Sequence, residues 1–180
     1  MLKKSTFKDV LLIIGMLIFS RLIPHLPNFT ALGAIAILSP LWFKENKNVL
    51  LIPLLALLIS DFLIGFHSTM LFTYLGVFLT SSLAWFNKKN NIKAEWSSFF
   101  YLGLSSSLLF YLLTNFGAWL MLDMYPKTAT GLILSYINGL PFLGFECLGT
   151  FFYLGCALCA RQIWIKNLIF SNQSFNLIEK

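Results

Sequence analysis

The sequence has little charge and few of the polar residues that cover a soluble domain. Charged residues make up 11% of its 180 residues, whereas a typical soluble domain has about 25%. Hydrophobic residues make up 58%, and the mean hydropathy is +0.78. Because so apolar a chain cannot surround a core with polar surface, the composition excludes a soluble globular domain and a disordered chain. We expect lipid to be its solvent.

The sequence also lacks motifs that carry chemistry. It has no G-x-x-x-x-G-K-[ST] loop, so it cannot energise transport with ATP alone, and it lacks H-E-x-x-H and G-x-S-x-G. Three cysteines are too few for a disulfide scaffold, and Cys156-x-x-Cys159 has no histidine or second pair nearby to complete a metal site. We therefore predict that the protein is not an enzyme, with no catalytic residue, cofactor or metal site.

Long runs with little charge predict an all-α, polytopic membrane protein. A helix needs about 20 apolar residues to cross a bilayer core of about 30 Å. The first two runs are short, but flanking lysines can snorkel and extend them. We expect one transmembrane domain over residues 1–170, followed by a polar tail over residues 171–180. Its six transmembrane helices are predicted at residues 10–20, 29–43, 49–66, 69–86, 96–122 and 143–165.

Two apolar segments need separate treatment. Residues 128–142 are interrupted by Gly131, Asn138-Gly139 and Pro141 and are too short to span comfortably. We therefore expect a short re-entrant or interfacial segment before the last helix. The apolar run that follows Met-Leu-Lys-Lys at the start lacks a small-x-small cleavage site, so we expect an uncleaved first helix instead of a signal peptide.

The distribution of Lys and Arg predicts the orientation in the membrane. With the N-terminus in the cytoplasm, all thirteen Lys and Arg residues except Arg21 and Lys127 fall on the cytoplasmic side. Because such a bias in short loops sets orientation, we expect both termini in the cytoplasm and the protein in a bacterial inner membrane. The bias also explains the net charge of +6 without nucleic acid as a partner.

In that orientation, unusual polar residues gather at the outer side. A charged group costs about 2.5–3.5 kcal/mol in a bilayer on insertion scales, so it should face an interior or a wet cavity. Apolar walls with a few placed polar groups are the general form of a small-molecule site. We predict an outward-facing ligand-binding pocket formed by Arg21, His25, Asn28, Asp61, His67, Tyr111, Asn115, Trp119, Tyr125, Lys127, Tyr136, Asn138 and Glu146.

These residues allow a functional and a structural interpretation. In the functional one, aromatic members stack on the ligand, amide and acidic members hydrogen-bond it, and basic members pair with its anionic groups. In the structural one, Arg21 pairs with Asp61 and Lys127 pairs with Glu146 to lock the loops. Asn115 then joins helices, which is common in membrane bundles.

Four blocks of residues resemble an uncharacterised family of small bacterial integral-membrane proteins. The first block is R-L-I-P-H-L-P-N-F-T at residues 21–30, and the others begin at Ser60, Thr114 and Tyr125. The resemblance spans residues 20–155. That family is similar in size and topology to the substrate-binding S components of energy-coupling-factor vitamin transporters. This likeness implies six helices, cytoplasmic termini and an outward-facing pocket for a vitamin-like nutrient, with cobalamin or its precursors as candidates.

We therefore expect a membrane protein that captures a small nutrient from outside and helps to move it inward. Movement would come from a partner module with an ATPase and a transmembrane coupling subunit, or from rocking of the bundle. The alternative is a structural or assembly subunit whose outer polar cluster docks another membrane protein. A lipid-directed enzyme that uses His25 or His67 as a base is a third class, without a nucleophile motif in the sequence.

Overall fold

The computed structural model describes residues 7–43, 47–89 and 96–178. Within these residues the chain is helical, without strands, which confirms the predicted all-α class. The elements in chain order are α1 (Phe7–Leu22), α2 (Leu32–Trp42), the 3-10 helix η1 (Lys47–Leu50), α3 (Leu51–Ile64), α4 (Met70–Lys89), α5 (Trp96–Met121) and α6 (Ala129–Ile178).

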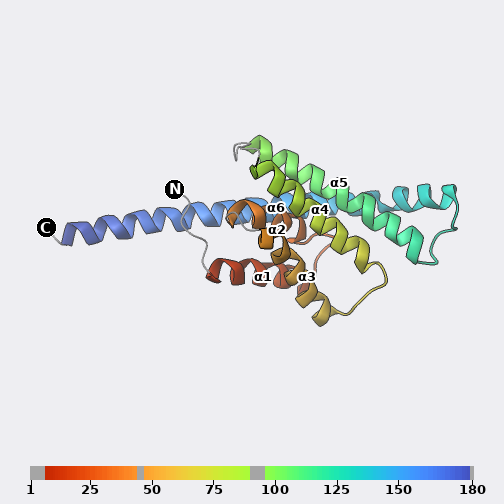
Figure 1. The fold of residues 1–180 in the computed structure, drawn as a ribbon, viewed down its shortest axis with the longest axis horizontal. Helices are drawn as coiled ribbons and strands as arrows, with labels where there is room; N and C mark the ends of the chain where they lie inside the picture. Colours follow the sequence, from red (N-terminus) through yellow and green to blue (C-terminus); the bar gives the residue numbers. More distant parts are fainter. Residues whose placement is uncertain (1–6, 44–46, 90–95, 179–180) are drawn as a thin grey trace.

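Three long helices and three short helices pack into one bundle. Helix α6 lies along the long axis, with α5 packed on it and α4 packed on α5 (Figure 1). Helix α2 packs against all three long helices, α3 packs against α4 and α2, and α1 packs against α3 and α2. Helix α1 begins and α6 ends at the same end of the molecule, whereas the α5–α6 turn lies at the opposite end (Figure 1). The long α5–α6 hairpin therefore extends beyond the short helices.

The long helices are the ones with the length and composition to cross a membrane. The spans are Met70–Lys88, Ser97–Met121 and Ala129–Gln162, and the other apolar helices cover Ile13–Leu22, Leu32–Trp42 and Asn48–Ile64. At 1.5 Å per residue, the 11 residues of α2 extend only about 16 Å, roughly half of a bilayer core. Three helices are thus long and apolar enough to cross a membrane, whereas six were predicted.

Helix α2 is the centre of the bundle. Its residues from Leu32 to Pro40 are all buried. The sequence L-G-A-I-A-I-L-S-P has no polar face to present to a solvent, and a helix that is apolar all round is expected to be buried. It packs against α3, α4, α5 and α6, so the other helices are arranged around it.

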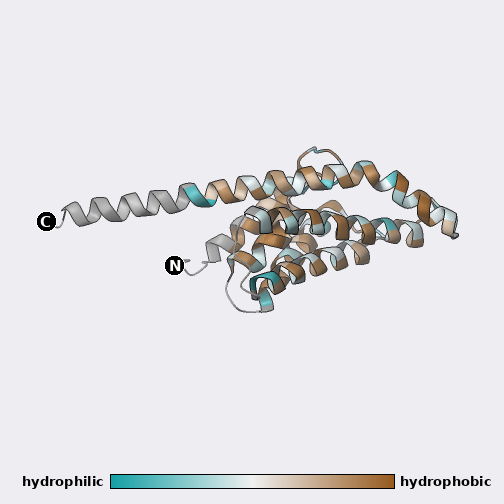
Figure 2. Ribbon diagram, turned by 90° about the horizontal axis from the view of Figure 1, so that it is seen from above, coloured by the Kyte–Doolittle hydropathy of each residue, from teal (hydrophilic) through white to brown (hydrophobic). Residues whose placement is uncertain are grey.

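The predicted re-entrant segment at residues 128–142 is wrong, because all of it except Thr128 is part of α6. This helix starts at Ala129 and continues through Pro141, although it bends in its N-terminal part (Figure 2). The glycines allow close packing instead of breaking the helix: a Cβ atom at Gly139 would overlap the Asn115 side chain, and one at Gly131 would overlap the Pro126 carbonyl. Glu146 consequently lies well inside α6, not at its start.

The same helix includes most of the predicted polar tail. Helix α6 continues past residue 170 to Ile178, and residues 179–180 lie outside the described residues. Some basic residues used to predict the orientation also lie outside them, namely Lys3, Lys4, Lys44, Lys93 and Lys180.

Large apolar side chains cover much of the described surface. Phe62 is 76% exposed and Leu71 is 72% exposed, and hydrophobic residues recur along the long helices (Figure 2). Extensive exposure of large apolar side chains marks a surface that contacts lipid or another protein.

Lys88 closes the C-terminal end of α2. Its Nζ donates hydrogen bonds to the carbonyl oxygens of Pro40 at 2.8 Å and Phe43 at 2.9 Å. The last carbonyls of a helix lack helical partners and carry partial negative charge. We predict that Lys88→Met lowers the free energy of unfolding by about 2 kcal/mol, measured by reversible denaturation of the purified protein.

Ser82→Ala is the control for this prediction, because the Ser82 hydroxyl donates to Phe78 in its own helix at 2.8 Å. We expect a change within about 0.5 kcal/mol. Equal losses in the two variants would contradict the capping role of Lys88.

Candidate functional site

A cavity of about 380 Å³ lies between the helices and is bordered by the α1–α2 and α3–α4 connections. Small-molecule pockets commonly have volumes of about 300–1,000 Å³. All six helices or their connections contribute, and most of the lining side chains are polar. The lining residues are Arg21, His25, Asn28, Thr30, Leu32, Ile64, His67, Thr69, Thr73, Phe110, Thr114 and Glu146.

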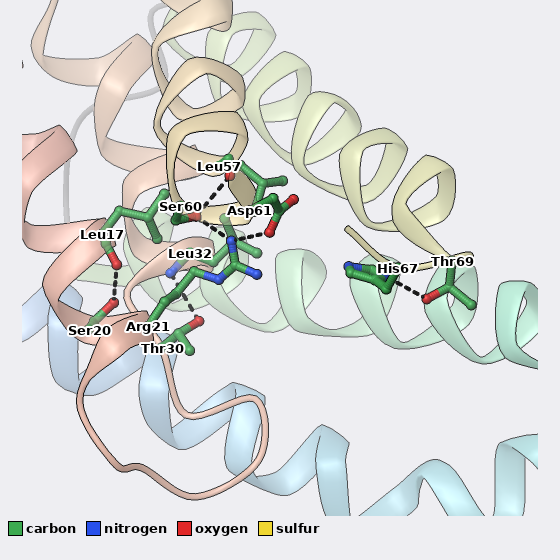
Figure 3. Close-up of polar contacts among 10 residues, drawn as sticks. All are labelled: Leu17, Ser20, Arg21, Thr30, Leu32, Leu57, Ser60, Asp61, His67 and Thr69. Carbon is green, nitrogen blue, oxygen red and sulfur yellow. Dashed lines mark hydrogen bonds and ion pairs between the residues drawn. The ribbon is translucent and has the colours of Figure 1, made fainter. Parts of the chain in front are cut away.

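A buried ion pair joins α1 to α3 beside this cavity. Arg21 Nη1 lies 2.6 Å from Asp61 Oδ1 and also donates to Ser60 Oγ, which in turn donates to the Leu57 carbonyl (Figure 3). Asp61 is completely buried, and the Arg21 side chain is only 15% exposed. The ion pair that the structural interpretation expects is thus present, and Arg21 in addition borders the cavity.

The α1–α2 connection folds back into the bundle and forms part of the cavity wall. Ser20 Oγ accepts a hydrogen bond from the Ala31 backbone N–H at 3.1 Å, which anchors the end of the connection to α1. Asn28 has a φ of 62°, a left-handed conformation that asparagine tolerates better than most residues. This turn places Thr30 and Leu32, at the N-terminal end of α2, in the lining of the cavity.

A glycine on α6 allows the connection to lie so close. An ideal Cβ atom at Gly149 would lie 3.0 Å from both Phe29 Cα and Thr30 N. Real Cβ atoms essentially never approach backbone atoms more closely than that. Gly149 therefore sets the position of the connection, and with it one wall of the cavity.

Glu146 borders the cavity from α6 and is only 2% exposed. Thr150 Oγ1 donates a hydrogen bond to its Oε1 at 3.3 Å. Gly33, in the first turn of α2, is so close that an ideal Cβ there would lie 3.0 Å from the same oxygen. Among the described residues Glu146 forms no ion pair. The expected pair with Lys127 is absent, because Lys127 donates instead to the Trp119 carbonyl at 2.5 Å and the Leu122 carbonyl at 2.6 Å.

The two histidines lie at the exposed edge of the cavity. His67 Nδ1 lies 2.9 Å from Thr69 Oγ1 (Figure 3), and His25 Nδ1 lies 2.7 Å from the Leu26 carbonyl. Both side chains are exposed, and both line the cavity. They come from different connections, so the fold brings together two residues that are far apart in the sequence.

A second group of predicted site residues holds α5 and α6 together, away from the cavity lining. Tyr111 Oη donates to the Tyr136 carbonyl at 2.6 Å, and Tyr136 Oη donates to the Leu112 carbonyl at 3.1 Å. Asn115 Nδ2 donates to the Tyr111 carbonyl of its own helix at 2.9 Å, and the Asn115 side chain lies against Gly139 of α6. The two tyrosine hydroxyls thus join the helices, and Asn115 contributes packing.

The turn of the same hairpin uses further predicted residues. Trp119 Nε1 donates to the Pro126 carbonyl at 2.9 Å, and Lys127 caps the end of α5. Tyr125 and Asn138 do not line the cavity either. The predicted site therefore divides into a cavity group and a hairpin group, with Asp61 attached to the first through Arg21.

Comparison with known protein families gives one match. The model of a family of unknown function, DUF6580, matches residues 2–169. The chain belongs to this family. No curated protein matches the chain, and no solved structure does. All residues that line the cavity of this DUF6580 protein lie within the matched segment.

Sequence reasoning missed the hydroxyl side chains of this DUF6580 cavity. Four threonines line it, namely Thr30, Thr69, Thr73 and Thr114. All except Thr73 stand in blocks that carry the family resemblance, and this proximity to predicted site residues was the available signal. Threonine is common in membrane helices as a packing residue, so its residue type alone did not single out any of the four.

Proposed function

We propose that this protein binds a small polar solute in the 380 Å³ cavity and helps to move it across a membrane. The observation that carries the proposal is the contrast between the cavity and the outer surface. Charged, imidazole and hydroxyl side chains border the cavity, while large apolar side chains cover the outside. Polar groups inside a membrane bundle are costly and typically mark the path of a solute.

The proposed topology is a six-helix bundle in a bacterial inner membrane with both termini in the cytoplasm. Helices α4, α5 and α6 are long and apolar enough to cross the bilayer. In the proposed topology the shorter α1, α2 and α3 provide the other three crossings. Two observations support this arrangement: α1 begins and α6 ends at one end (Figure 1), and Lys and Arg are concentrated in the segments expected there. The cavity then opens to the outside.

The cavity volume favours a ligand of modest size. About 380 Å³ lies in the lower part of the usual range for small-molecule pockets. It suits a vitamin-like solute with one or two rings better than a complete cobalamin. As in the S components that the sequence resembles, energy would come from a partner ATPase module or from rocking of the bundle.

The alternative role, an assembly subunit that docks a partner through an outer polar cluster, has less support. The polar residues proposed for docking border the cavity or are hydrogen-bonded within the α5–α6 hairpin. Few of them are left to face a partner protein.

Filling the cavity should abolish binding. Thr114 lines the cavity, and its hydroxyl donates to the Phe110 carbonyl of its own helix at 2.8 Å, so Thr114→Trp acts mainly by occupying space. We predict that a dialysable extract of bacterial small molecules raises the thermal unfolding midpoint of the wild-type protein but not that of Thr114→Trp, because ligand binding stabilises the folded state.

Leu108→Trp is the matched control, because Leu108 lies on the same helix, is 50% exposed and does not line the cavity. This variant should respond to the extract as the wild-type protein does. No stabilisation of the wild type, or equal stabilisation of Thr114→Trp, would reject the cavity as the binding site.

A further inference from the structure

The charges around the cavity do not balance, and the following inference about its ligand rests on the proposed function. Apart from the two histidines, the lining contains one basic and one acidic residue, Arg21 and Glu146. Asp61 already neutralises Arg21 at 2.6 Å. Among the described residues no cation lies within ion-pair distance of Glu146. The cavity lining therefore includes one acidic group without a counter-ion among the described residues.

The surroundings of Glu146 compensate an ionised carboxylate only in part. Gly33 has no side chain, which lets the Glu146 oxygen approach the first turn of α2. The N-terminus of a helix carries a partial positive charge equivalent to about half an elementary charge. Thr150 adds one hydrogen bond to Oε1. These groups stabilise the anion in part but do not supply a full counter-charge.

A buried carboxylate is stable only when a proton or a cation compensates its charge. Only 2% of Glu146 is exposed, and this residue borders the cavity. The neighbouring lining adds the hydroxyls of Thr73 and Thr114 and the ring of Phe110. Such a ring also attracts a cation through its face.

We infer that the solute carries a cationic nitrogen group, such as a protonated amine or an amidinium, and that this group binds Glu146. A charged N–H donor would form a short, charge-assisted hydrogen bond with the carboxylate. The remaining part of the solute then lies toward the threonines and Phe110. Glu146 is the residue that selects for charge.

The test separates the dialysable extract on a cation exchanger into a retained, cationic fraction and an unretained fraction of neutral and anionic compounds. We expect the cationic fraction to raise the unfolding midpoint of the wild-type protein. Glu146→Gln keeps the shape and removes the charge, so it should need at least about tenfold more of that fraction for the same shift. Asp123→Asn removes an exposed acid outside the cavity and should respond like the wild type.

Each result has a distinct meaning. Stabilisation of the wild type by the unretained fraction alone would overturn the cationic ligand and leave the proposed function standing. No stabilisation by either fraction would overturn the proposed function itself. An equal response of Glu146→Gln and the wild type to the cationic fraction would mean that Glu146 holds only a proton. The comparison of the two fractions needs no variant, so it decides the ligand class even if Glu146→Gln does not fold.

Discussion

Removing one partner of the Arg21–Asp61 pair is expected to destabilise the protein by about 3–5 kcal/mol, because the other charge stays buried without a counter-ion. Asp61 is completely buried, and the pair joins the ends of α1 and α3. We predict this loss for Arg21→Met, which leaves the carboxylate unpaired. Asp61→Asn should lower the free energy of unfolding by somewhat less, because the unpaired Arg21 side chain is 15% exposed and can reach the cavity.

The double variant Arg21→Met/Asp61→Asn completes the cycle. Since it contains neither charge, its loss should be clearly smaller than the sum of the two single losses. The free energies of unfolding of the wild type, the two single variants and the double variant, measured in the same detergent, give the coupling energy between Arg21 and Asp61. Additive losses would show that the two residues do not interact in the folded protein. The exposed Asp123→Asn is the control for losing a carboxylate elsewhere.

A methyl group at Gly149 is expected to have the second large effect. In Gly149→Ala the new Cβ would press against Phe29 Cα and Thr30 N at 3.0 Å, and backbone atoms cannot rotate away. The α1–α2 connection must move, which displaces one cavity wall. We predict a loss of about 1–3 kcal/mol in the free energy of unfolding and loss of the stabilisation by the extract.

Two other glycines of α6 provide matched controls. At Gly144 and Gly155 nothing lies within 4 Å of an added Cβ atom. Gly144→Ala and Gly155→Ala should therefore be neutral, or more stable by up to about 1 kcal/mol because alanine favours helix. If Gly149→Ala behaves like these two variants, the connection does not pack against α6 as described.

The distribution of charge in the sequence was sufficient to predict the fold class and most helices. The runs at residues 69–86 and 96–122 correspond closely to Met70–Lys89 and Trp96–Met121. Residues 128–142 were misjudged because glycine and proline are read as helix breakers. In this protein Gly131 and Gly139 permit contacts with Pro126 and Asn115, and such contacts depend on a tertiary neighbour that the local sequence does not reveal.

The candidate site was predictable to the extent that topology determines it. Arg21, His25, Asn28 and His67 lie in or next to two connections that were expected at the same side, and all four line the cavity. Residues on long helices depend on helix rotation, which sequence alone does not give. Asn115 therefore packs against Gly139, while Thr114, one position earlier, faces the cavity.

The central claim is that a water-accessible cavity opens to the outer side of an apolar bundle. Cysteine accessibility in intact cells tests it most directly, in a background in which Cys147, Cys156 and Cys159 are replaced by alanine. A membrane-impermeant thiol reagent should label Thr114→Cys from outside, as it labels the exposed turn variant Asp123→Cys, and should not label the lipid-facing Leu108→Cys. Failure to label Thr114→Cys, or labelling of it only from the cytoplasmic side, would contradict the account.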